Sequence, residues 1–285
     1  MKVIRARVLG FCMGVRRAVT RALDEARAAS KAPVYTLGPL IHNPQVLETL
    51  KDQGIEILQE GNFGDLKGKT VLIRAHGVNP QVEKKLLASG ARIRDLTCPR
   101  VKNSQMKARS LAEAGYCLFL AGEKDHGEII GIQGYAPDCA VAANPPDAEM
   151  AAENLYRQRP QAKTALLGQT TLSADEYGAI GENIRKWFPD LKTIDTICGA
   201  TQDRQNALKE LCPQVDAVII AGGKTSANTR RLLSIARSLN KPAWLVENER
   251  EIPKEIENYA LVGLSAGAST PDTIIDAVEK TLCAL

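Results

Sequence analysis

Short apolar stretches alternate with longer amphipathic stretches along the whole chain. Runs such as KTVLIRAHG (69–77), DAVIIAGG (216–223) and ALVGLSAGAST (260–270) predict buried strands that end in polar loops. Between such runs, GVRRAVTRALDEARAA (14–29) and PDTIIDAVEKTL (271–282) have the apolar spacing of amphipathic helices. The repeated order of strand, loop and helix predicts an α/β fold with small, mostly parallel sheets, whose ligands lie beyond the carboxyl ends of the strands.

One junction occurs three times: a strand-like stretch ends at a cysteine and a helix begins. The cysteines are Cys12 in VIRARVLGFCMGVRRAV, Cys98 in ARIRDLTCPRV and Cys198 in LKTIDTICGATQDRQNAL, spaced by roughly 90 to 100 residues. This spacing suits a small βα domain repeated with diverged sequence. We therefore predict three α/β units, 13–97, 98–197 and 198–285.

The two ends of the chain predict how the third unit is completed. This unit lacks a strand after its last helix, whereas KVIRARV (2–8) is a strand with no earlier unit to join. The simplest closure adds residues 1–12 to the sheet of the third unit. Three equivalent sheets then predict a trefoil of pseudo-threefold-related α/β domains with the three cysteines at its centre.

Composition narrows the classes of protein. The chain has 285 residues, 44% of them hydrophobic and 25% charged, as in ordinary globular proteins. A net charge of +4 and 4% aromatic residues argue against a nucleic-acid partner. No apolar run is long enough for a membrane span, and charges interrupt the N-terminal stretch, so we predict a cytoplasmic protein without a membrane partner.

The seven cysteines indicate metal chemistry rather than disulfides. None forms a C-x-x-C pair, which argues against a zinc ribbon, and their odd number argues against a disulfide framework. Three converging thiolates indicate a metal with one open position, either zinc with a water or an iron–sulfur cluster. The other cysteines have no equivalent in the repeat, and we predict that they are buried, inert thiols: Cys117, Cys139, Cys212 and Cys283.

Six polar loops, two in each unit, contain the remaining candidate residues. The loops hold all three histidines of the chain and several hydroxyl and amide side chains: His42, His76, His126, Thr170, Thr171, Ser226, Asn228 and Ser269. The loops after Ser226 and Ser269 run into helix N-termini, which favour anions, so a phosphorylated substrate is predicted. Glu128 is the one carboxylate in this set. It is interpreted either as a proton donor beside a reacting carbon–oxygen bond or as a solvated loop charge.

Eight motifs, taken in order, resemble one enzyme family. They are GFCMGVRRAV, LGPLIHNPQV, RAHGVNP, TCPRV, QTTLS, DTICGATQDRQ, GGKTSANTRRL and AGASTPD. The chain resembles the 4-hydroxy-3-methylbut-2-enyl diphosphate reductases, the last enzymes of the methylerythritol phosphate route to isoprenoids, over residues 1 to about 282. The resemblance implies a reductive dehydroxylation that uses two electrons and yields isopentenyl and dimethylallyl diphosphate.

The resemblance also implies roles for the candidate residues. Cys12, Cys98 and Cys198 would hold a 4Fe-4S cluster whose fourth iron is open to the substrate hydroxyl. Glu128, with Thr170 or Thr171 and His126, would serve the allylic hydroxyl and relay protons. The diphosphate would be bound by His42, His76, His126, Thr170, Ser226, Ala227, Asn228 and Ser269. A ferredoxin or flavodoxin would supply electrons, because the chain has no G-x-G-x-x-G fingerprint.

The sequence departs from the family pattern at three positions. Ala227 stands where a second serine is usual, so one hydroxyl donor is lost, although its backbone N–H could still serve a phosphate. Gly127 replaces a proline, which would loosen the segment that carries Glu128. Gly199 replaces an asparagine.

Two other classes of protein stay open at this point. A quinolinate-synthase-like dehydratase is also a pseudo-threefold triplicate, but its carboxylate-rich substrates call for arginines in the loops. Only Arg74, Arg230 and Arg231 lie near them. The other class is a non-catalytic iron–sulfur or zinc sensor, in which Glu128 would be dispensable.

Overall fold

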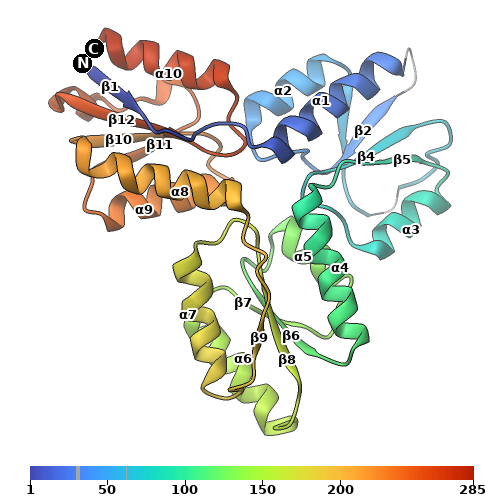
Figure 1. The fold of residues 1–285 in the computed structure, drawn as a ribbon. Coiled ribbons are helices and arrows are strands. Elements are labelled where there is room, and N and C mark those ends of the chain that lie inside the picture. The colour runs from blue at the N-terminus through green and yellow to red at the C-terminus, as the bar shows by residue number, and fades with distance from the viewer. Residues whose placement is uncertain (30–32, 62) are drawn as a thin grey trace. The chain divides into compact units, whose positions relative to one another are not determined.

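Three four-stranded parallel sheets form the framework of the protein in a computed structural model that describes residues 1–29, 33–61 and 63–285 (Figure 1). In chain order, the first sheet and its connecting helices comprise α1 (Met13–Ala28), β2 (Val34–Leu37), α2 (Pro44–Asp52), β3 (Ile55–Leu58), β4 (Thr70–Ile73), α3 (Pro80–Ala88) and β5 (Arg92–Asp95). The second comprises α4 (Pro99–Glu113), β6 (Cys117–Ala121), α5 (Gly127–Gln133), β7 (Ala140–Ala142), α6 (Pro145–Gln158), β8 (Thr164–Gly168), α7 (Ala174–Arg185) and β9 (Lys192–Thr193).

The third sheet combines the C-terminal part of the chain with its first strand. Its elements are β1 (Lys2–Arg5), α8 (Gly199–Leu211), η1 (Cys212–Gln214), β10 (Ala217–Ala221), α9 (Ala227–Ser238), β11 (Ala243–Val246), η2 (Glu249–Glu251), η3 (Lys254–Asn258), β12 (Leu261–Ala266) and α10 (Asp272–Ala284). Strand β1 pairs in parallel with β12, in the register Lys2 opposite Leu261. The prediction that the N-terminal strand completes the third sheet is therefore confirmed.

The strand order is the same in all three sheets. It is β3-β2-β4-β5 in the first, β7-β6-β8-β9 in the second and β11-β10-β12-β1 in the third. The repeated topology confirms the α/β class and three sheet-containing repeats. The unit boundaries at 97/98 and 197/198, and the trefoil arrangement, stay predictions.

Buried central strands explain the continuous apolar runs of the sequence. All four residues of β4 and all five of β10 are buried, as expected of parallel strands covered on both faces. In the third sheet, Ile219 and Leu264 pack with Val278 of α10, whereas the opposite face packs on α8 and α9. Helices therefore cover both faces of this sheet, with α10 on one face and α8 and α9 on the other.

The packing divides the chain into two compact units that do not follow the three sheets. One unit comprises Met1–Arg16, Ile41–Asp52 and Gly199–Leu285, and the other comprises Arg17–Leu40 and Gln53–Cys198. The segment 41–52, which contains α2, thus packs with the third sheet although it lies between two strands of the first. Among the described residues, no helix combines the length and apolar character that crossing a membrane requires.

Candidate functional site

The three candidate cysteines have the same local structure. Each directly precedes a helix, α1, α4 or α8. Each donates its backbone N–H to a carbonyl two residues beyond the third strand of its sheet. The pairs are Cys12 with Ala268 (3.1 Å), Cys98 with Ala75 (2.9 Å) and Cys198 with Thr170 (2.9 Å). In each repeat, a backbone hydrogen bond therefore holds the cysteine against the polar loop that follows β12, β4 or β8.

The chemistry of these thiols suits a soft metal group. All three are half-buried and none is in a disulfide. The Cys12 sulfur accepts the N–H of Val15 in the first turn of α1, at 3.4 Å. The first turn of α1 therefore points a backbone N–H at this sulfur.

The first polar loop of each sheet places one candidate five positions after the first strand. These residues are His42, His126 and Ser226. His126 caps α5, where its Nδ1 accepts the N–H of Glu128 at 3.2 Å, and Ser226 caps α9, where its Oγ accepts the N–H of Thr229 at 3.4 Å. The expectation that loops continue through Glu128 and Asn228 is wrong, because α5 and α9 begin directly after these caps.

The second polar loop of each sheet also has an equivalent position. His76, Thr171 and Ser269 each directly follow the carbonyl that binds a cysteine N–H. Ser269 donates its hydroxyl to the His42 carbonyl at 3.2 Å, which joins two predicted diphosphate-binding residues. In the other compact unit, the rings of His76 and His126 meet edge to face, with centroids 5.2 Å apart.

Glu128 is buried and held by Thr170. Its side chain is 1% exposed. One carboxylate oxygen accepts the Thr170 N–H and the other accepts the Thr170 hydroxyl, both at 2.8 Å. The interpretation of Glu128 as a solvated loop charge is therefore wrong. A continuous path joins Cys198, Thr170 and Glu128, because Cys198 donates to the Thr170 carbonyl.

Thr170 and Thr171 have different surroundings. The Thr171 hydroxyl accepts a hydrogen bond from the Gln169 side-chain amide at 2.9 Å, whereas Thr170 contacts Glu128. Sequence reasoning missed Gln169, which is fully buried and whose amide oxygen also accepts the N–H of Glu123. Its position directly before the two threonines was the available signal.

Asn228 has the clearest unmet hydrogen-bonding capacity of the predicted diphosphate-binding residues. It is 3% exposed, and neither its amide nitrogen nor its amide oxygen has a hydrogen-bond partner within residues 1–29, 33–61 and 63–285. Buried amides are nearly always satisfied, so this pair of atoms is suited to bind a polar ligand. Ala227, its neighbour, is also buried.

Arg74 occupies the space beside Gly127. A Cβ at position 127 would lie 2.8 Å from an Arg74 guanidinium nitrogen, and one at Gly38 would lie 2.7 Å from another. Arg74 pairs with Glu60 at 3.3 Å, and burial lowers the pKa of its guanidinium. The glycine departure therefore makes room for an arginine, rather than simply loosening the segment before Glu128.

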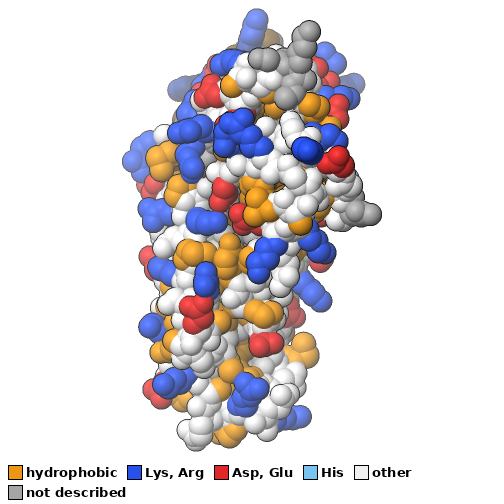
Figure 2. Space-filling model, turned by 90° about the vertical axis from the view of Figure 1, so that its right-hand side faces the viewer, with side chains coloured by type: hydrophobic (Ala, Val, Ile, Leu, Met, Phe, Trp, Pro, Cys, Tyr) orange, Lys and Arg blue, Asp and Glu red, His pale blue; other side chains and the backbone are white. Residues whose placement is uncertain are grey.

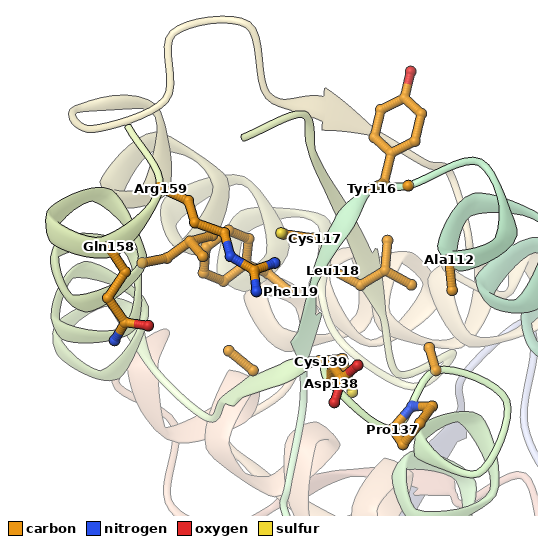
Figure 3. Close-up of a pocket in the computed structure, with 14 residues that line it drawn as sticks. Ala112, Tyr116, Cys117, Leu118, Phe119, Pro137, Asp138, Cys139, Gln158 and Arg159 are labelled. Atoms are coloured by element: carbon orange, nitrogen blue, oxygen red, sulfur yellow. The ribbon is translucent and has the colours of Figure 1, made fainter. Parts of the chain in front are cut away.

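The four remaining cysteines differ in burial. Cys212 is buried in the core of the third sheet, as predicted, whereas the prediction for Cys283 is wrong because it is exposed. Cys117 and Cys139 are half-buried and line a hollow of about 420 Å³ with Arg159 (Figure 3). Burial raises the pKa of Cys139 to about 11. Because Cys117 begins β6, this hollow lies at the end of the second sheet opposite Thr170.

Comparison with known proteins identifies the family. The LytB protein family matches residues 3–283. The chain belongs to the LytB family. Two members named 4-hydroxy-3-methylbut-2-enyl diphosphate reductase are similar over nearly their whole length. The Treponema denticola protein is 46% identical, with 99% of each chain covered, and the Aquifex aeolicus protein is 39% identical, with 98% of this chain and 95% of the relative covered.

Two solved LytB-type structures share the fold. The E-1-hydroxy-2-methyl-but-2-enyl-4-diphosphate reductase of Plasmodium falciparum has a TM-score of 0.91 at 28% identity, covering 98% of this chain and 87% of that one. A second, described as (E)-4-hydroxy-3-methyl-but-2-enyl diphosphate reductase, the terminal enzyme of the non-mevalonate pathway, has a TM-score of 0.70 at 38% identity. All of both chains is covered.

Proposed function

We propose that this protein reduces 4-hydroxy-3-methylbut-2-enyl diphosphate to isopentenyl and dimethylallyl diphosphate, as the terminal step of non-mevalonate isoprenoid synthesis. Full-length similarity to reductases of that name supports the substrate. The observation that carries the proposal for this chain is the buried Glu128 carboxylate. It is held by Thr170, whose carbonyl binds the N–H of Cys198.

We infer an iron–sulfur cofactor held by Cys12, Cys98 and Cys198. LytB enzymes are iron–sulfur proteins. The finer proposal is a 4Fe-4S cluster with one iron free of protein ligands, supported by three unbridged thiols with the same backbone hydrogen bond. Such a group, when bound, supplies electrons and a Lewis-acidic iron. The backbone hydrogen bonds of this chain keep each thiol at the carboxyl end of its sheet.

The diphosphate is assigned to the polar loops and helix starts. His42 and Ser269 are joined by a hydrogen bond, and His76 and His126 meet edge to face. Asn228 adds a buried amide with both polar atoms available. Ser226 and the backbone N–H of Ala227 complete the set at the start of α9, whose positive end favours an anion.

The proton is assigned to Glu128. Glu128 is the buried carboxyl group that would pass a proton to the departing hydroxyl, and the Thr170 N–H and hydroxyl fix where its two oxygens lie. The allylic hydroxyl departs as water once it gains a proton, and Thr170 keeps the donor in place. His126 supports the same segment, because its Nδ1 accepts the Glu128 N–H.

An anaerobic assay tests the proposed function. The purified protein is reconstituted with iron and sulfide and mixed with reduced methyl viologen, and 4-hydroxy-3-methylbut-2-enyl diphosphate is then added. We expect substrate-dependent viologen oxidation and both C5 diphosphate products. No oxidation by a preparation with a verified cluster would refute the proposed reaction.

A further inference from the structure

A surface hollow adjoins both chain neighbours of Cys98. It has a volume of about 390 Å³ and is lined by Arg17, Asp95, Thr97, Pro99, Lys102, Asn103 and Met106. Thr97 and Pro99 directly flank Cys98, and Arg17 donates to the Thr97 carbonyl at 3.3 Å. A molecule bound in this hollow would therefore contact the residues on both sides of Cys98.

The chain segment that forms most of the hollow is rich in Lys and Arg. Residues 80–113, which include α3, β5 and α4, contain eight Lys and Arg but only three Asp and Glu. Figure 2 views the side on which α3 and α4 lie in Figure 1, and Lys and Arg are the more widespread charged side chains there. Two of the three acids are paired, Asp95 with Lys102 at 3.1 Å and Glu113 with Arg109 at 2.8 Å, and Arg94 is paired with Glu25 of α1 at 2.8 Å. The positive charge is therefore in excess.

Two arginines and one methionine make this surface suitable for an acidic protein. Arg17 and Arg100 are exposed and form no ion pair with any residue in the described part of the chain. Met106, 38% exposed, supplies an apolar contact in the hollow. A flexible thioether beside the unpaired Arg17, with Arg100 close by in sequence, suits a transient interface, because charge then guides the encounter and a small apolar centre forms the contact.

We propose that this surface docks a small acidic electron-carrier protein. The inference rests on the proposed function, which consumes two electrons and two protons as a C–O bond breaks, a C–H bond forms and water leaves. Each encounter would deliver one electron, and the carrier is oxidised by one electron. Redox partners form small interfaces that depend on charge, and the electron would enter beside Cys98.

Charge reversal at Arg100 tests the docking surface. We expect Arg100→Glu to reduce flavodoxin-driven turnover about tenfold at low ionic strength, and Arg17→Glu/Arg100→Glu to reduce it further, since steering by charge changes association by factors of about 10 to 1,000. The loss should shrink as salt is added. Methyl viologen, a small cation, should reduce both variants at least as fast as it reduces the unaltered protein.

Lys163→Glu is the matched control. Lys163 is exposed, and its carbonyl accepts the N–H of Cys117, which follows the C-terminal end of α4. Arg100 lies at the N-terminal end of α4, and the helix between the two ends is about 20 Å long. This control should keep full flavodoxin-driven turnover. Flavodoxin-driven turnover that is unchanged in the double variant would overturn the docking surface while leaving the proposed function intact. Equal losses with viologen and flavodoxin would also overturn it, and absent viologen turnover by the unaltered protein would instead refute the function.

Discussion

At the scale of single residues, Glu128 carries the proposed proton transfer, and its environment is specific. A carboxyl group that is almost fully buried needs hydrogen-bond partners, and Thr170 supplies two of them. The two residues lie 42 positions apart in sequence, so no local sequence pattern predicts their contact. Function and packing thus depend on the same two side chains.

Substitution of Glu128 separates an enzyme from a sensor. We expect Glu128→Gln to lower turnover by roughly 100-fold or more, because proton transfer by a positioned group contributes about that much, while the amide keeps the shape. Iron and sulfide content should stay unchanged. Turnover within a factor of two of the unaltered protein in the viologen assay would remove Glu128 from the mechanism.

Thr170 should act by positioning Glu128. Thr170→Val removes the hydroxyl that donates to the carboxylate but keeps the size of the side chain. A hydrogen bond to a charged group is worth about 1.5 to 3 kcal/mol, so we expect kcat to fall about tenfold or more and its pH dependence to shift. Thr170→Ser, which restores the hydroxyl, should recover most of both. An unchanged pH profile in the valine variant would contradict this role.

The Cys139 thiol should react slowly with alkylating reagents. Its pKa of about 11 keeps it protonated at neutral pH, and only the thiolate is nucleophilic. We expect its alkylation rate to rise about tenfold per pH unit between pH 8 and pH 10. Peptide mapping after timed labelling measures this, with the exposed Cys283 as the internal standard. A rate that levels off below pH 9 would contradict the raised pKa.

At the scale of helices and strands, the sequence pattern predicted the repeated framework but not its fine contacts. Strands such as β4 and β10 were predictable because residues buried on both faces give unbroken apolar runs. The start of α5 was not, because a histidine cap and a glycine are weak helix signals. The packing of segment 41–52 with the third sheet was equally hidden, since it depends on contacts such as Ser269 with His42.

The role of the N-terminal strand can be tested with two neighbouring prolines. Lys2 donates its backbone N–H to Ala260, which directly precedes β12, and Ala6 donates to Leu264 of β12. Alternation along the strand then assigns the N–H of Ile4 to the same side and that of Val3 to the open edge. We expect Ile4→Pro to lower the free energy of unfolding by about 1 to 3 kcal/mol, because it leaves a β12 carbonyl without its donor, and Val3→Pro to lower it clearly less. Chemical denaturation measures both, and equal losses would contradict the pairing.

At the scale of the whole molecule, the three equivalent cysteines should act as one set. We expect Cys12→Ser, Cys98→Ser and Cys198→Ser each to abolish the visible absorbance of the reconstituted cluster, whereas Cys283→Ser, at an exposed cysteine outside the repeat, should keep it. Iron analysis and absorption spectra measure the outcome. Full absorbance in any one of the first three variants would refute three-cysteine ligation.

The pairing of β1 with β12 also has a consequence for biosynthesis. Lys2 lies opposite Leu261, so β1 leaves the ribosome long before the strand with which it pairs. At about 5 to 20 residues per second, that delay is on the order of 10 to 50 s. During this time the nascent chain presents an unpaired β-edge segment with Cys12 close behind it. Cofactor loading that needs Cys12 in its folded position can therefore begin only after β12 has been made.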